Sequence, residues 1–160
     1  MTAPLEVTAR GDLEVVVTRS FAAPPDLVFD AWTKRELLQR WLGVFGNWTL
    51  PICEVDLRVG GAYRYTWRNA SGGEMTARGV FLEIERPTRI VTTERFDDPW
   101  YPGEGLNTLV LESEGDGTLS TLTMRFETRE ARDAVLASPM DTGLEKGFVA
   151  LDGVLDAAVA

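Results

Sequence analysis

Residues 144–158 read LEKGFVALDGVLDAA, and this stretch indicates how the rest of the chain folds. Its large apolar residues recur four, three and four positions apart, at Leu144, Phe148, Leu151 and Leu155. That spacing places them on one face of an α-helix, with acidic residues on the other side. Thr142 and Glu145 have the spacing of a capping box, so we expect the helix to begin there. Gly147, at the edge of the apolar face, leaves a notch that favours space for a ligand.

The composition excludes several classes of protein. The length of 160 residues is typical of one domain, and we expect a single domain over residues 1–160. A net charge of −9 argues against binding to nucleic acid or to an anionic membrane surface. We see no signal peptide and no apolar run of membrane-spanning length. Cys53 is the only cysteine, which favours a cytoplasmic protein without disulfides.

The chain contains no histidine. This excludes Ser–His and Cys–His catalysis, and it removes the commonest general base and the usual histidine-containing zinc sites. We therefore predict neither a metal nor a cofactor, and we recognise no catalytic motif.

The secondary-structure pattern runs from one strand through two short helices into a series of strands. Residues 13–21 are rich in β-branched side chains and predict the first strand. Residues 25–42 predict the two short helices, and residues 48–126 predict a run of antiparallel strands. A short helix over residues 128–138 then precedes the long one, and residues 1–11 are interpreted as a loose lead-in. This order indicates an α+β fold in which a curved antiparallel sheet wraps the last helix.

Six short segments, in this order and at these spacings, carry a resemblance to a known family. They are residues 19–24 (RSFAAP), 28–33 (VFDAWT), 38–41 (LQRW), 55–61 (VDLRVGG), 79–84 (GVFLEI) and 117–123 (GTLSTLT). The chain resembles the START-like or Bet v 1-like superfamily, also called SRPBCC, and within it the family named for the activator of Hsp90 ATPase. The match runs from residue 13 to the C-terminus.

This resemblance implies a helix-grip fold, in which about seven strands curve around a long C-terminal helix and leave a cavity between them. Relatives bind lipids, hormones or polyketides in that cavity or act as polyketide cyclases, and others are co-chaperone domains. We find no counterpart of the separate N-terminal domain of the full eukaryotic co-chaperone, which argues against Hsp90 activation. The resemblance transfers no catalytic residue to this chain.

Aromatic residues alternate with polar ones along one predicted strand, at Tyr63, Tyr65 and Trp67. The alternation places their side chains on one face. We predict that they form an aromatic wall of a small-molecule pocket, facing Met140 and Phe148. Met75 and Met124 offer further adaptable lining. The alternative interpretation is that these side chains are ordinary core.

Two further places contribute to the predicted ligand site. Trp100 and Tyr101 lie in a Pro- and Gly-rich loop over residues 97–105, which acts either as a lid or as a segment that its aromatic residues pin to the body. Glu94 and Arg95 are neighbours in a strand, so one of them faces the concave side. An ionisable group there must be paired or bind a polar ligand. We include Glu94, Arg95 and Trp100 among the ligand-binding residues.

Other candidate residues receive structural interpretations. Glu54 and Asp56 share a strand face and have the spacing of an acid–base pair, but a solvated surface is the favoured explanation. Cys53 is interpreted as a buried inert thiol, since no histidine can activate it. Arg19 is expected to anchor the first strand through a salt bridge.

We therefore predict a small soluble protein that binds an apolar or aromatic molecule between sheet and helix. One alternative is a polyketide cyclase- or dehydratase-like enzyme, in which a Tyr, Arg or carboxylate moves a proton. The other is a co-chaperone-like interaction module, for which a chaperone partner or a homodimer is compatible with the sequence.

Overall fold

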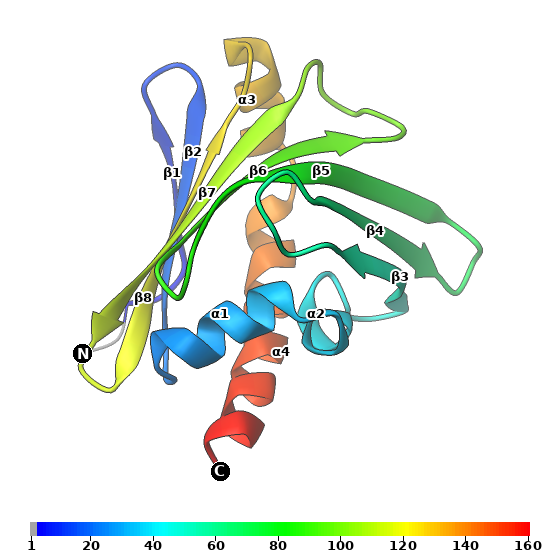
Figure 1. Cartoon of the computed structure of the whole chain (residues 1–160). Helices are drawn as coiled ribbons and strands as arrows, with labels where there is room; N and C mark the ends of the chain where they lie inside the picture. The colour runs from blue at the N-terminus through cyan, green and yellow to red at the C-terminus, as the bar shows by residue number, and fades with distance from the viewer. Residues whose placement is uncertain (1–2) are drawn as a thin grey trace.

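The computed structural model describes residues 3–160, in which an eight-stranded antiparallel sheet is wrapped over a long helix (Figure 1). The strands are β1 (Glu6–Arg10), β2 (Glu14–Phe21), β3 (Trp48–Val55), β4 (Ala62–Asn69), β5 (Glu74–Glu85), β6 (Arg89–Phe96), β7 (Gly105–Glu114) and β8 (Gly117–Arg125). Their order in the sheet is β1-β2-β8-β7-β6-β5-β4-β3, so the strands from β3 to β8 form a meander that β2 closes at β8. This α+β arrangement confirms the predicted helix-grip fold.

The helices gather on one side of the sheet, as Figure 1 shows. They are α1 (Pro25–Thr33), α2 (Arg35–Trp41), α3 (Arg129–Ala137) and α4 (Met140–Val159). The two short helices after β2 are thus confirmed. Pro25 opens α1, where the fixed φ of proline suits the first turn. None of the helices in residues 3–160 combines the length and the apolar character that crossing a bilayer requires.

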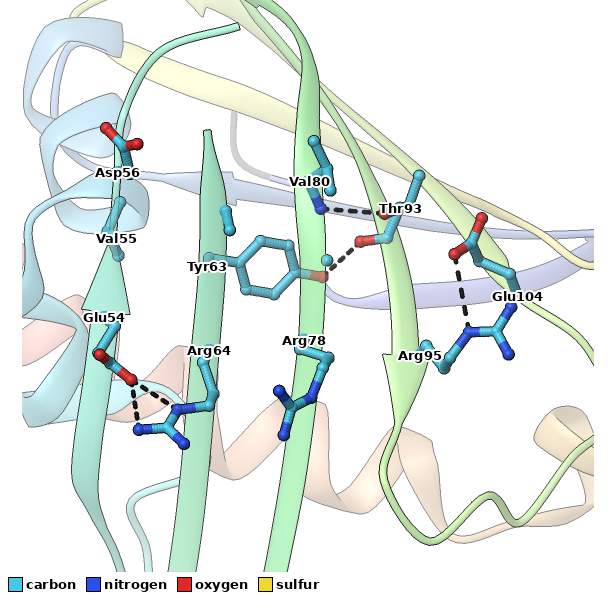
Figure 2. Close-up of a pocket in the computed structure, with 12 residues that line it drawn as sticks. Glu54, Val55, Asp56, Tyr63, Arg64, Arg78, Val80, Thr93, Arg95 and Glu104 are labelled. Atoms are coloured by element: carbon cyan, nitrogen blue, oxygen red, sulfur yellow. Dashed lines mark hydrogen bonds and ion pairs between the residues drawn. The ribbon is translucent and has the colours of Figure 1, made fainter. Parts of the chain in front are cut away.

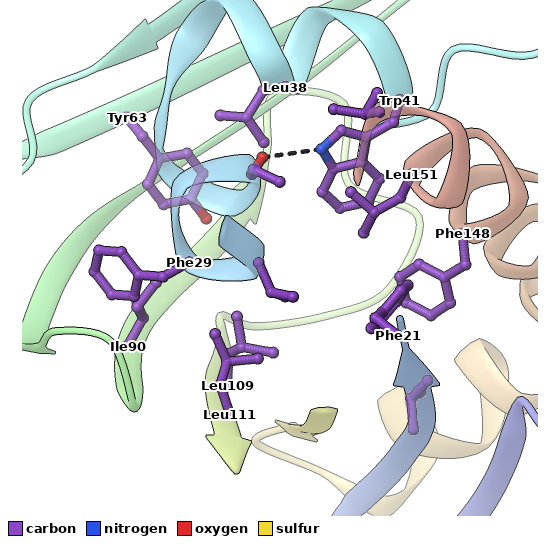
Figure 3. Packing of buried hydrophobic residues seen from close by; sticks show 14 of the residues in the cluster. Phe21, Phe29, Leu38, Trp41, Tyr63, Ile90, Leu109, Leu111, Phe148 and Leu151 are labelled. Carbon is purple, nitrogen blue, oxygen red and sulfur yellow. Dashed lines mark hydrogen bonds between the residues drawn. The ribbon is translucent and has the colours of Figure 1, made fainter. Parts of the chain in front are cut away.

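The apolar face of α4 packs into the core through large side chains (Figure 3). Phe148 meets Phe21 of β2 edge to face, with ring centroids 5.4 Å apart, and Leu151 is fully buried close by. Trp41 of α2 lies next to Phe148, and its indole N–H donates to the Ala31 carbonyl at 2.9 Å. The predicted apolar stripe of the last helix therefore holds β2, α1 and α2 together.

An ion pair adds direction to this packing. The Nη1 and Nη2 atoms of Arg19 on β2 each donate to one carboxylate oxygen of Asp152 on α4, both at 2.7 Å. The Arg19 side chain is only 12% exposed, and its guanidinium lies over the Phe21 ring at 4.9 Å. The expected salt bridge of Arg19 is confirmed, and it fixes the position of the long helix on the sheet.

The N-terminal prediction is wrong for Glu6–Arg10. These residues form β1, an edge strand that pairs with β2 in the register Val7↔Val17. Gly11 in the connecting turn has φ +58°, a conformation that favours glycine. The apolar signal was weak, because an edge strand buries only part of one face; Leu5 and Val7 pack against the core. The first two residues of the expected lead-in lie outside the described residues.

The start of α4 also differs from the prediction. The helix begins at Met140 directly after Pro139, so Thr142 lies in the first turn and is not an N-cap. Gly147 does not open onto free space: a Cβ there would lie 3.6 Å from the carbonyl oxygen of Trp41. That distance is an ordinary van der Waals contact, so an alanine would also fit here, and the expected notch for a ligand is absent.

The Arg19–Asp152 pair gives a test of what holds α4 in place. We expect Arg19→Met to lower the free energy of unfolding by about 2 kcal/mol, since it removes two charge-assisted hydrogen bonds in a largely buried position. Urea unfolding monitored by circular dichroism measures the change. Arg78→Met is the matched control. Arg78 makes a bidentate ion pair with Asp97 on the exposed outer face of the sheet, where ion pairs contribute little to stability. Equal losses in both variants would contradict this role.

Candidate functional site

A partly enclosed cavity of about 220 Å³ lies between the sheet and the helices. Strands β4 to β8 form one side of it, and Trp32 of α1, Leu42 after α2 and Leu144 of α4 form the other. Apolar and aromatic side chains make up most of its wall, with a few polar groups from neighbouring strands. That combination is typical of small-molecule sites.

Aromatic rings from two strands form a continuous wall on the sheet side. The ring centroids of Tyr63 and Tyr65 are 4.8 Å apart, and those of Tyr65 and Trp67 are 5.9 Å apart. Phe81 of β5 extends the row at 5.8 Å from Tyr63. The alternation along β4 places its three rings on the cavity side, because successive side chains of a strand point to opposite faces.

Hydrogen bonds fix both ends of this wall. The Trp67 indole N–H donates to the Leu42 carbonyl at 2.8 Å, and the Tyr63 hydroxyl donates to the Thr93 carbonyl at 2.6 Å. Figure 2 shows Tyr63 reaching across β5 to Thr93. It passes over Gly79, where an added Cβ would collide with the ring and with the Thr93 carbonyl oxygen. The rings are therefore held in place before any ligand binds.

Glu94 of β6 is the acidic group of the cavity wall. Its side chain is partly buried and lines the cavity. Burial raises the pKa of the Glu94 carboxyl above its usual value of 4.5. Asn107 of β7 and the Tyr101 hydroxyl are polar neighbours that favour the charged form and oppose this rise only in part.

Tyr101, from the loop that precedes β7, places its hydroxyl near Glu94. Its ring packs edge to face on Phe126 at 5.2 Å and on Phe96 at 6.0 Å, and it is buried. Its hydroxyl has no partner in good hydrogen-bond geometry within the described chain. Trp100, by contrast, is 46% exposed and stacks on the outside of this cluster. Of the two interpretations of the loop, the geometry favours a pinned segment over a lid.

A wider groove of about 720 Å³ lies over β3 to β6, and its lining is drawn in Figure 2. Three arginines line it, and each has a carboxylate partner: Arg64 pairs with Glu54 at 2.5 Å, Arg78 with Asp97 at 2.5 Å and Arg95 with Glu104 at 3.8 Å. Because these charges are already matched and exposed, the groove does not have the character of an anion site.

The comparisons with known proteins agree with this geometry. The family model described as "Activator of Hsp90 ATPase homolog 1-like protein" matches residues 22–156. The chain belongs to this family. A crystal structure of a protein from Rhodobacter sphaeroides is 31% identical, with a TM-score of 0.90 over 96% of this chain and 98% of that chain. No curated protein matches the sequence.

More distant members of the fold are also similar. A protein from Nitrosomonas europaea is 25% identical, with a TM-score of 0.81 over 94% of this chain and 98% of that one. An HSP90 activator from Plasmodium falciparum is 24% identical, with a TM-score of 0.65 over 90% of this chain and 96% of that one. The likeness to the Plasmodium protein shows a shared fold alone.

The structure divides the predicted site residues of this family member into two groups. The cavity wall contains Tyr63, Tyr65, Trp67 and Glu94. Elsewhere lie Met75, which is 41% exposed, Arg95 on the outer groove, Trp100 on the surface, Phe148 in the core beside Phe21, and Met140 at the start of α4. None of this second group belongs to the cavity wall, whereas Met124, also considered, does.

Sequence reasoning missed several wall residues: Trp32, Leu42, Phe81, Thr92 and Asn107. Trp32 and Leu42 reach the cavity only through the docking of α1 and α2, which no local pattern encodes. Asn107 lies two residues before Leu109, so the sequence indicates that both side chains share one face of the strand. That Asn107 is opposite Thr92 of β6 depends on the register between strands, which one sequence does not reveal.

Three candidates that the sequence analysis set aside, Cys53, Glu54 and Asp56, have structural roles. Cys53 is buried, and burial raises the pKa of its thiol to about 11, so it lacks the thiolate character of a nucleophile. Glu54 pairs with Arg64 and Asp56 pairs with Arg58 at 2.9 Å, both on the exposed face. No group of three His, Cys, Asp or Glu side chains suited to a metal ion occurs in residues 3–160.

The enclosed carboxyl makes stability depend on pH in a defined direction. Because the pKa of Glu94 is raised in the folded state, the folded protein keeps a proton that the unfolded chain releases, and stability falls as pH rises from about 4.5 to that raised pKa. We expect Glu94→Gln to be more stable than the parent at neutral pH. The difference should grow with pH by up to about 1.4 kcal/mol per unit and then level off.

Urea unfolding of both proteins across this pH range measures the difference directly. Glu112→Gln, at an exposed position of β7, is the control and should change stability little at every pH. If the difference in free energy of unfolding between the parent and Glu94→Gln stays constant across this pH range, burial does not raise the pKa of Glu94.

Proposed function

We propose that this protein binds a compact aromatic or apolar small molecule in the cavity between β4–β8 and the helices. The observation that carries this proposal is the preformed aromatic wall of a partly enclosed cavity, in which hydrogen bonds fix the rings of Tyr63 and Trp67. A wall that is ordered in advance loses little side-chain entropy when a ligand binds.

The size of the cavity supports a small ligand. Sites for drug-sized ligands span roughly 300–1,000 Å³, and an engineered apolar cavity of about 150 Å³ accepts benzene. The volume of about 220 Å³ lies between these two cases. A single substituted aromatic ring therefore fits better than a fatty acid or a multi-ring polyketide.

Filling the cavity tests this proposal. Leu144→Trp places a larger side chain on the α4 side of the wall, and we expect it to weaken the binding of a neutral aromatic probe, tert-butylbenzene, by at least about tenfold, or 1.4 kcal/mol. Isothermal titration calorimetry gives the affinity, and thermal unfolding shows whether the variant still unfolds cooperatively.

Val149→Trp is the matched control, because Val149 lies on the exposed side of the same helix. It should bind the probe as the parent does. If the parent binds no neutral aromatic probe, or if both tryptophan variants bind equally well, the cavity is not a binding site.

Proton-transfer catalysis in the same cavity is a second candidate. Glu94 favours it, since an enclosed carboxyl with a raised pKa is the usual form of a general acid or base near neutral pH. If the protein turns over a cyclase or dehydratase substrate, loss of that turnover in Glu94→Gln, with unchanged binding of the neutral probe, would support this candidate.

A chaperone partner is a third candidate, carried by an exposed apolar surface. It consists of Leu57, Val59, Val80 and Leu82, which lie close together because the turn at Gly60–Gly61 hydrogen-bonds to Phe81. Exposed apolar groups of this kind occur at protein interfaces. An Hsp90 ATPase rate that rises on adding the protein, and does not rise with Val59→Asp, would support it.

A further inference from the structure

We propose that the ligand of this cavity carries a positively charged nitrogen, and that Glu94 is its counter-ion. This inference rests on the proposed binding function and specifies its ligand as a compact organic cation, such as an amine or ammonium group attached to an aromatic ring.

Among the described residues, the cavity wall contains no positive charge that could neutralise the Glu94 carboxylate. The wall of the cavity in the described chain contains Glu94 but no Lys or Arg. The adjacent Arg95 points to the outer groove and pairs with Glu104, and Arg19 is committed to Asp152. A buried carboxylate is costly unless it is paired, so the cavity provides one half of an ion pair.

The second argument is the chemistry of the rings. Tyr63, Tyr65, Trp67 and Phe81 form the row beside which Glu94 lies. The faces of aromatic rings carry partial negative charge and attract cations, most strongly in a site from which water is excluded. An apolar ligand would gain from the rings but would leave the Glu94 carboxylate without an opposite charge, whereas an organic cation uses both.

The third argument is the charge of the whole chain. The net charge of −9 creates a potential that attracts cations and repels anions. An anionic ligand such as a fatty acid would meet this potential and then the Glu94 carboxyl. The proposal therefore excludes carboxylate ligands from this site.

Glu94 is the carboxyl group of the wall, and burial raises its pKa above the usual value of 4.5. The other titratable groups around it are the hydroxyls of Tyr63 and Tyr65 from β4 and of Tyr101 from the loop before β7, and burial raises the pKa of each further above its usual value of 10. The remaining elements contribute Trp32 and Leu144, which do not titrate, and Asn107 is neutral. A pH dependence of cation binding thus reports on Glu94.

The test uses two probes of the same shape. Phenyltrimethylammonium carries a fixed positive charge and no titratable proton, and tert-butylbenzene is its neutral isostere. We expect the parent protein at about pH 8 to bind the cation at least about tenfold more tightly than the isostere in isothermal titration calorimetry. In Glu94→Gln this preference should fall by about tenfold or more, while the isostere binds as before.

A second measurement needs no variant. Cation binding favours the charged form of Glu94, so the affinity of the parent for phenyltrimethylammonium should increase with pH, by up to about tenfold per pH unit below the raised pKa, and then level off. The affinity for tert-butylbenzene should not follow that curve.

The outcomes separate this inference from the function on which it rests. If the neutral isostere binds as well as the cation, or better, the cavity is a binding site but the inference is wrong. If the cation preference survives in Glu94→Gln, the rings alone account for it and Glu94 is not the counter-ion. If neither probe binds, the proposed function fails and the inference fails with it.

Discussion

The bidentate ion pair between Arg19 and Asp152 is the interaction on which the arrangement of the structure depends. It joins β2, near one edge of the sheet, to the middle of α4, and both hydrogen bonds are 2.7 Å long. Packing of Phe148 on Phe21 supplies the apolar part of the same contact. Because packing alone is not directional, the ion pair fixes the axial position of the helix. The axial position of α4 determines where Leu144 lies, and therefore the volume of the cavity between α4 and the sheet.

The space that remains is unlike the rest of the core. Elsewhere the interior is filled by interlocking side chains such as Trp41, Phe148 and Leu151. Under β4–β6 the rings are held to the sheet and to the end of α2 by their own polar atoms, and a carboxyl is enclosed beside them. A protein selected for stability alone would gain from an apolar residue in place of Glu94, because burying a carboxyl without an opposite charge beside it costs free energy. Retaining one in an aromatic cavity is what a binding or catalytic site requires.

Much of the fold could be predicted from the sequence, because the signals that define it are local. The spacing of Leu144 to Leu155 and the alternation at Tyr63 to Trp67 each depend on one element, and both are confirmed. Site residues contributed by docking or by pairing could not be predicted. Residues Ile90 and Val91 are both buried, so the apolar pattern of β6 does not tell which face Glu94 takes. Phe148 and Met140 were assigned to the pocket because their helix faces the sheet, but the cavity meets α4 only at Leu144.

The most direct test of the account is the pKa of Glu94, measured by NMR from the chemical shift of its carboxyl carbon. We predict a value above 4.5 in the free protein, a decrease when phenyltrimethylammonium is added, and no such decrease with tert-butylbenzene. A pKa at or below 4.5 that neither probe moves would show that Glu94 is exposed to water, and it would contradict both the enclosed site and its preference for a cation.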